Sequence, residues 1–136
     1  MDNSRQSCEI EIRVRYAETD AMGALHHSRH WVYFETGRTE LLRAQGIAYR
    51  DLESDGVFFV VAKCAAKYIA PARYDDLLKL TTSVAKVGAA RIDHAYELRR
   101  ADDGVLLATA QTTLACVDRD GRVIPMPSYV RQGARS

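Results

Sequence analysis

The chain has 136 residues, of which 47% are hydrophobic and 27% charged, and its formal net charge is +1. This length allows one domain with one core, which we expect to span residues 1–136. The small net charge gives no broad electrostatic reason to expect nucleic acid or a membrane surface as a partner. No apolar run approaches the roughly 18 residues of a membrane helix, so we expect no membrane insertion. The N-terminus also lacks the apolar core of a signal peptide.

The three cysteines, Cys8, Cys64 and Cys116, are widely spaced and odd in number. No CxxC pair occurs, so zinc and redox motifs are not supported. Reduced thiols in the cytoplasm are the simplest interpretation, and we expect a cytoplasmic protein.

The first predicted element is a strand. Residues 8–16 alternate polar and apolar side chains, which puts Ile10, Ile12, Val14 and Tyr16 on one face. Residues 17–27 contain Gly23 and no sustained periodicity, which indicates a loop or a short irregular turn.

A long helix is predicted next, with Ser28 as the N-cap and Gly46 as the C-cap. Its apolar stripe consists of Phe34, Gly37, Leu41 and Ala44. A glycine inside a helix costs about 1 kcal/mol relative to alanine. Close packing of the helix against a sheet would explain Gly37.

After a short helical segment at 47–56, the pattern becomes typical of strands, near 57–70, 76–87, 90–100 and 105–117. A last short strand is expected at 122–127 and a weak helix at 128–133. The order predicts a two-layer α+β domain, in which a long central helix packs on a five- to six-stranded antiparallel sheet. One helix covers only part of such a sheet, so we expect a homo-oligomer.

Asp20 is the main candidate for chemistry, and two interpretations are open. As a turn residue it would bond its own backbone, as aspartate commonly does. Alternatively, it lies just before a helix start, where free backbone N–H groups can stabilise an oxyanion. A carboxylate facing such donors suits acyl transfer to water.

Three histidines, His26, His27 and His30, crowd the same segment. With Glu18 or Asp20 they would offer ligands to a divalent metal, but the spacing is not HExxH and no second cluster follows. We therefore expect no metal. The alternative for His30 is a surface position on the helix.

Two segments carry a family resemblance: "VRYAETDAMGALHHSRHWVYFETGRTELLR" at 14–43 and "YIAPARYDDLLKLTTSV" at 68–84. Together they resemble hotdog-fold acyl-CoA thioesterases of the 4-hydroxybenzoyl-CoA thioesterase family, over roughly residues 9–130. The family pattern is an aromatic-x-x-T-D-x-x-G turn, then a His or aromatic residue at the helix start, then F-E-x-x-R. The resemblance implies the hotdog fold, assembly into dimers or tetramers, and no metal or bound cofactor.

Carried over by position, the resemblance implies that Asp20 is the catalytic carboxylate and that the backbone N–H of His27 polarises the thioester carbonyl. Tyr16 matches an aromatic residue beside the site, and Gly23 the glycine that lets the turn approach the ligand. This chain departs from the family at His26 and His30, where relatives usually have tyrosines, and these two positions are expected to contact the acyl group.

The resulting prediction is an acyl-CoA thioesterase that converts a thioester and water into a free acid and CoA. Asp20 acts as nucleophile or as general base, and the acyl carrier is CoA or an acyl carrier protein. A hydratase or dehydratase acting on acyl thioesters, and a non-catalytic acyl-CoA binding protein, are the alternatives.

Overall fold

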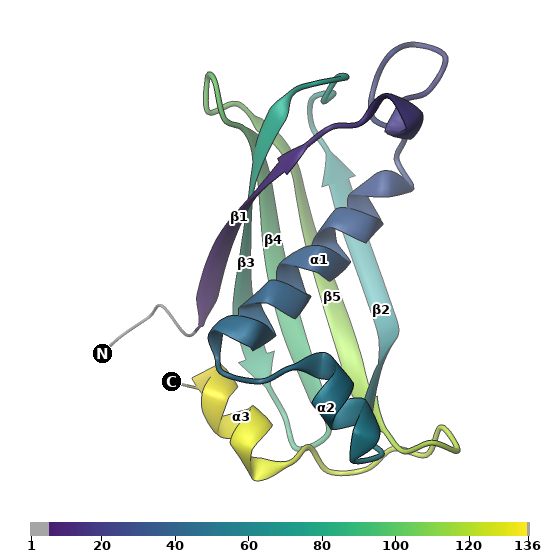
Figure 1. The fold of residues 1–136 in the computed structure, drawn as a ribbon, viewed down its shortest axis with the longest axis vertical. Coiled ribbons are helices and arrows are strands. Elements are labelled where there is room, and N and C mark those ends of the chain that lie inside the picture. The colour runs from purple at the N-terminus through teal and green to yellow at the C-terminus, as the bar shows by residue number, and fades with distance from the viewer. Residues whose placement is uncertain (1–5, 136) are drawn as a thin grey trace.

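The computed structural model describes residues 6–135, and within them five strands form one antiparallel sheet. The strands are β1 (Ser7–Arg13), β2 (Phe58–Tyr68), β3 (Leu77–Val87), β4 (Arg91–Arg100) and β5 (Leu106–Val117). Their order across the sheet is β1-β3-β4-β5-β2 (Figure 1). The helices are α1 (Arg29–Ala44), α2 (Tyr49–Ser54) and α3 (Ser128–Arg135), and a 3-10 turn, η2, spans Tyr16–Glu18. The predicted α+β architecture is confirmed.

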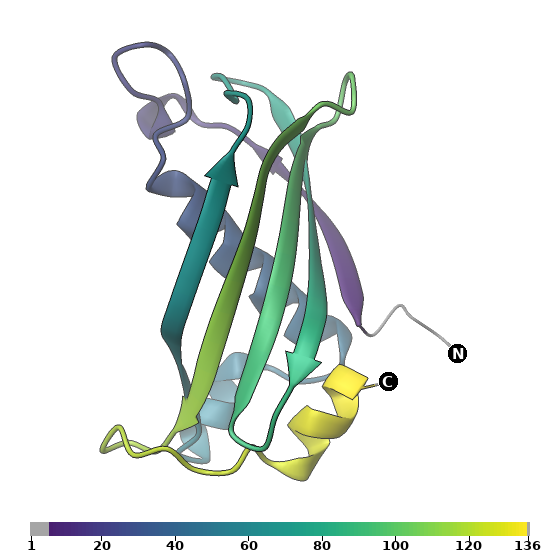
Figure 2. The same cartoon turned by 180° about the vertical axis from the view of Figure 1, so that it is seen from behind.

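Helix α1 lies across one face of the sheet and leaves the other face uncovered in the described part of the chain (Figures 1 and 2). Phe34 of α1 stacks on Tyr96 of β4 with 4.7 Å between ring centroids. Gly37 lies on the same stripe, and a Cβ atom added there would collide with the side chains of Thr82 and Leu80. The close packing that was predicted to explain Gly37 is therefore present: the helix lies too near the sheet for a larger side chain at this position.

Two predictions about strands were wrong. β1 ends at Arg13, so Tyr16 is not on a strand face but in η2. The chain leaves the sheet because the N–H of Glu18 donates to the carbonyl of Arg15, at 3.0 Å, which closes the turn. Residues 122–127 form no strand in the structure: Val123 makes only an isolated bridge to Val117. Pro125 lacks the N–H that a longer ladder needs.

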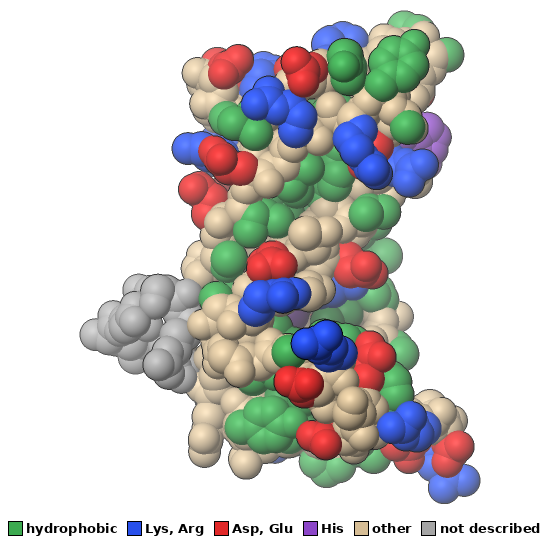
Figure 3. Space-filling view, viewed as in Figure 1, with side chains coloured by type: hydrophobic (Ala, Val, Ile, Leu, Met, Phe, Trp, Pro, Cys, Tyr) green, Lys and Arg blue, Asp and Glu red, His purple; other side chains and the backbone are tan. Residues whose placement is uncertain are grey.

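β2 is an edge strand, because it pairs with β5 on one side and with no other strand among the described residues. Its Val60 and Val61 side chains are exposed. Cys8, Cys64 and Cys116 are all free thiols. None of the helices in residues 6–135 is long and apolar enough to cross a membrane. Acidic and basic side chains mix over the helix side of the molecule (Figure 3).

Candidate active site

A tight turn between η2 and α1 presents Asp20. Thr19 and Leu25 form an isolated bridge, and the Asp20 N–H donates to the Ala24 carbonyl at 2.8 Å. The Gly23 N–H donates to the Asp20 carbonyl at 3.0 Å, and Gly23 has φ +78°, a conformation that disfavours other residues. The turn therefore needs a glycine for its own geometry, whatever it binds.

The Asp20 carboxylate is exposed, and its Oδ1 atom accepts hydrogen bonds from the N–H groups of Met22 (2.9 Å) and Ala24 (3.1 Å). This is the backbone-bonding role expected of a turn aspartate. It occupies Oδ1 and leaves Oδ2 without a hydrogen bond among the described residues. Asp20 thus has both a structural oxygen and one directed to solvent.

The backbone N–H of His27 is the donor that the resemblance points to. Its neighbours are bonded: the N–H of His26 donates to the Glu18 carbonyl at 2.9 Å, and that of Arg29 to the His26 carbonyl at 2.9 Å. The N–H of Ser28 donates to Nδ1 of His26 at 3.2 Å. No acceptor for the His27 N–H is found within residues 6–135. The free donor lies just before the N-cap residue Ser28, not in the first turn of α1.

Tyr68, at the end of β2, binds the carbonyl of His27, the residue with the free N–H. The sequence did not indicate this role for Tyr68. Its hydroxyl donates to the His27 carbonyl at 3.1 Å. Its ring packs edge-on against His30 with 4.8 Å between centroids. The only sequence signal was the position of Tyr68 at the start of the second family-like segment.

The three histidines do not point to a common centre. The rings of His26 and His27 lie against each other, 4.2 Å apart. Nδ1 of His26 is held by Ser28, whose hydroxyl lies 2.8 Å away and whose backbone N–H donates to it at 3.2 Å. His30 instead faces the core, so the surface position considered for it is wrong. Burial lowers the pKa of His30 below its ordinary value of 6.5. No group of three or more His, Cys, Asp or Glu residues suited to a metal is found among the described residues.

Glu18 anchors the segment from inside. Only 3% exposed, it accepts hydrogen bonds from the Arg15 N–H at 2.9 Å and the Tyr33 hydroxyl at 2.8 Å. Burial raises the pKa of Glu18, but these hydrogen bonds and the Arg15 charge outweigh burial and bring it below its ordinary value of 4.5. The carboxylate therefore stays ionised and ties η2 to α1.

The two family-like segments meet in space. The Leu25 N–H donates to the Ala72 carbonyl at 2.8 Å, and Ala24 forms a bridge with Arg73. Tyr16 is exposed, and its ring packs edge-on against Tyr74 of the same loop, 5.5 Å between centroids. Tyr16 thus belongs to the rim of the candidate site, beside the loop that precedes β3.

Comparisons with known proteins identify the family of the chain and its fold. The model of the Thioesterase-like superfamily matches residues 14–133. The acyl-CoA thioesterase YbgC of Haemophilus influenzae is 38% identical over 108 residues, 79% of this chain and 78% of the relative. The DHNA-CoA thioesterase structure from Staphylococcus aureus has a TM-score of 0.86 at 31% identity, covering 90% of this chain and 83% of that one.

The 4-hydroxybenzoyl-CoA thioesterase structure from Pseudomonas sp. strain CBS-3 has the same fold, with a TM-score of 0.86 at 18% identity, and covers 94% of this chain and 99% of that one. The hotdog fold and the enzyme class predicted from sequence, a thioester hydrolase, are therefore confirmed. The chain belongs to the Thioesterase-like superfamily.

Proposed function

We propose that this enzyme hydrolyses acyl-CoA thioesters to a free acid and CoA, with Asp20 and the backbone N–H of His27 as its catalytic groups. The observation that carries the proposal is the unbonded His27 N–H, preceded in the same turn by a carboxylate with one oxygen free. The relatives named as acyl-CoA thioesterases support the substrate class.

The chemistry follows from what these groups can supply. The His27 N–H donates to the thioester oxygen, where negative charge develops during addition to the carbonyl. Asp20 then either attacks the carbonyl carbon, giving a mixed anhydride that water opens, or takes a proton from an attacking water. In both routes CoA leaves as the thiol. Neither route needs a cofactor or a metal.

The other predicted residues have supporting roles in this proposal. Gly23 gives the turn its shape, and Tyr16 lies at its rim. His26, whose ring lies on that of His27, lines the approach to the donor. His30, buried and packed edge-on against Tyr68, contacts the part of the acyl group that enters the core.

The direct test is Asp20→Asn, read by CoA release with a thiol reagent over aromatic, short, medium and long acyl-CoA substrates. Asparagine keeps an Oδ1 acceptor for the Met22 and Ala24 N–H groups, so the turn should persist. We expect kcat to fall by about 10²-fold or more, with an unchanged melting temperature. Asp102→Asn, in another exposed turn, is the matched control. Near-normal turnover by Asp20→Asn would refute the assignment.

We also propose that the protein is a homo-oligomer that associates through β2. No strand within residues 6–135 pairs with the outer edge of β2, and Val60 and Val61 expose apolar surface beside it. An open, apolar edge of 11 residues is a template for a second strand. In this proposal residues 1–136 act as one domain in the cytoplasm, with the three free cysteines in keeping with a reducing compartment.

A further inference from the structure

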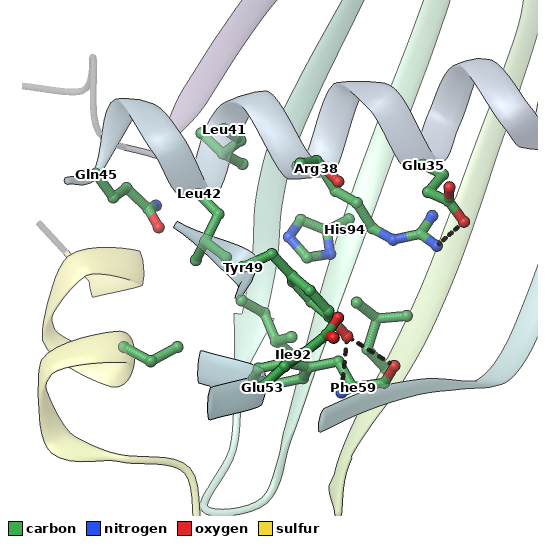
Figure 4. A pocket seen from close by; sticks show the side chains of 13 residues that line it. Glu35, Arg38, Leu41, Leu42, Gln45, Tyr49, Glu53, Phe59, Ile92 and His94 are labelled. Carbon is green, nitrogen blue, oxygen red and sulfur yellow. Dashed lines mark hydrogen bonds and ion pairs between the residues drawn. The ribbon is translucent and has the colours of Figure 1, made fainter. Parts of the chain in front are cut away.

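A hollow lies between α1 from Glu35 onward, helices α2 and α3, and the sheet (Figure 4). It has a volume of about 370 Å³. No residue before Glu35 lines it, so it is separate from the Asp20 turn within the described chain. Arg38, in its wall, is nine residues from the start of α1, or about 14 Å along the helix at 1.5 Å per residue. Nothing in the proposed thioesterase chemistry uses this cavity.

His94 of β4 lines this cavity with a buried side chain. The residue is only 6% exposed, and its Nδ1 atom is buried with no hydrogen-bond partner in the described structure. Burial, together with the charge of Arg38, lowers the pKa of His94 to about 4, so its ring is neutral at pH 7. A buried polar atom without a partner destabilises the fold unless a ligand or water satisfies it.

Arg38 brings a positive charge that has no close counter-charge. Its side chain is 16% exposed, yet its nearest carboxylate oxygen, on Glu35, is 4.0 Å away on a side chain that is 71% exposed. Its other contact is a long hydrogen bond of 3.5 Å to the hydroxyl of Tyr96. Both contacts are weak, and solvent screens the ion pair. A partly buried guanidinium in this state favours a carboxylate, which matches its fork of donors.

The remaining walls are mostly apolar. The apolar side chains are those of Leu41, Leu42, Phe59, Ile92, Leu114 and Val130, and Thr39 and Gln45 add two polar side chains. Tyr49 adds a ring face but no free polar group, because its hydroxyl donates to the Phe59 carbonyl and accepts from the Phe59 N–H. The second acidic side chain in the lining, Glu53, is exposed. The cavity therefore has one basic side chain, Arg38, in a wall that is otherwise mostly apolar.

We propose that this cavity binds a small free carboxylic acid, whose carboxylate pairs with Arg38 and accepts a hydrogen bond from His94 while its apolar body fills the chamber. A neutral ligand of the same shape leaves the guanidinium without a counter-charge. A wholly apolar ligand leaves His94 unsatisfied as well. The carboxylate is the chemistry that completes both groups.

The test uses benzoate as the probe, with benzamide as its neutral isostere, in calorimetric titrations of the purified protein. We expect benzoate to bind at least about tenfold more tightly than benzamide. Arg38→Gln should remove this preference, whereas Arg43→Gln, an exposed position on the same helix, should retain it. Equal binding of the two probes, no benzoate binding at millimolar concentrations, or an unchanged preference in Arg38→Gln would overturn the proposal.

Two further variants keep the result interpretable. Arg38→Lys retains the charge without the planar fork and should weaken benzoate binding less than Arg38→Gln. Asp20→Asn should bind benzoate as the wild type does, because the cavity does not include the active-site turn. If hydrolysis fails but benzoate selectivity persists, the proposed activity is wrong and the carboxylate site stands.

Discussion

The two oxygens of the Asp20 carboxylate have different surroundings, and this orients the group before any substrate arrives. Oδ1 is fixed by the N–H groups of Met22 and Ala24 at 2.9 and 3.1 Å. The plane of the carboxylate is therefore set by the turn, and Oδ2 has no hydrogen bond among the described residues. A reacting group held in one orientation avoids the entropic cost of ordering it during the reaction.

Buried histidine makes the stability of the fold depend on pH. The pKa of His94 is about 4 in the folded chain, against an ordinary value of 6.5. Below pH 6.5 the unfolded chain binds a proton that the folded chain does not, so stability decreases as the pH falls from 6.5 to 4 and then levels off. The full loss from this residue is about 3 kcal/mol.

We therefore predict that His94→Gln flattens the pH dependence of the free energy of unfolding between pH 6.5 and 4, as measured by urea denaturation. Parallel curves for the wild type and His94→Gln would contradict the prediction. His30, which is also buried, adds a loss of the same sign in both proteins and so cancels in the comparison.

At the residue scale, the sequence predicted the groups with strong local patterns and missed those that depend on distant partners. Asp20 and Gly23 are set by the turn itself. Glu18 is buried because it meets Tyr33, 15 positions further along the chain. Tyr68 contacts a carbonyl 41 positions away. No periodic pattern in the sequence predicts either contact, because each forms only when folding brings distant segments together.

At the scale of elements, the spacing between α1 and the sheet is set by one missing side chain. Any Cβ at position 37 would overlap Thr82 and Leu80, so α1 lies as close to β3 as a glycine permits. The His27 peptide, just before α1, is tied to the sheet separately, by the hydrogen bond from Tyr68 of β2. Gly37 thus lowers the helix propensity of α1, but it allows the helix to pack closely against the sheet.

We predict that Gly37→Ala lowers the free energy of unfolding, because the overpacking cost of about 1–3 kcal/mol exceeds the helix-propensity gain of about 1 kcal/mol. Gly133→Ala in α3 is the matched control. A Cβ there meets its nearest atom at 3.5 Å, an ordinary contact, so this variant should be neutral or slightly stabilising. Chemical denaturation of both variants measures the difference. Stabilisation by Gly37→Ala would show that the helix can move away from the sheet freely.

The sequence predicted most elements but not the end of β1. Alternation continues through Val14 to Tyr16, yet the chain turns after Arg13. The N–H of Val14 still bonds to the carbonyl of Asp76 at 3.0 Å, and η2 begins two residues later. Side-chain alternation reports which face is buried but carries no information about where the strand's hydrogen-bonding partner ends.

At the scale of the whole molecule, the order of the strands decides which surfaces stay open. β2 follows α1 and α2 in the chain but lies at the opposite edge from β1, beside β5. Periodicity predicted the strands themselves and could not order them. The resemblance implied the hotdog fold, but no strand order was predicted, since strand pairing depends on contacts far apart in sequence.

We predict that Val61→Lys reduces the size of the assembly, because it places a charge in the apolar surface beside the open edge of β2. Light scattering coupled to size-exclusion chromatography measures the molar mass. Val123→Lys makes the same change at another exposed valine, outside the named strands, and should leave the mass of the wild type unchanged. A monomeric wild type, or equal masses for both variants, would contradict association through β2.

The hydrogen bond from Tyr68 to the carbonyl of His27 has a kinetic consequence. Tyr68 belongs to β2, the strand on which a second copy would pair, while the N–H of His27 is the donor that would stabilise the reacting oxyanion. If the copies separated, the outer edge of β2 would lose its partner strand. Tyr68 would then be held less firmly, and with it the His27 peptide. The turnover per subunit should then decline on dilution below the dissociation constant, although no catalytic group has been removed.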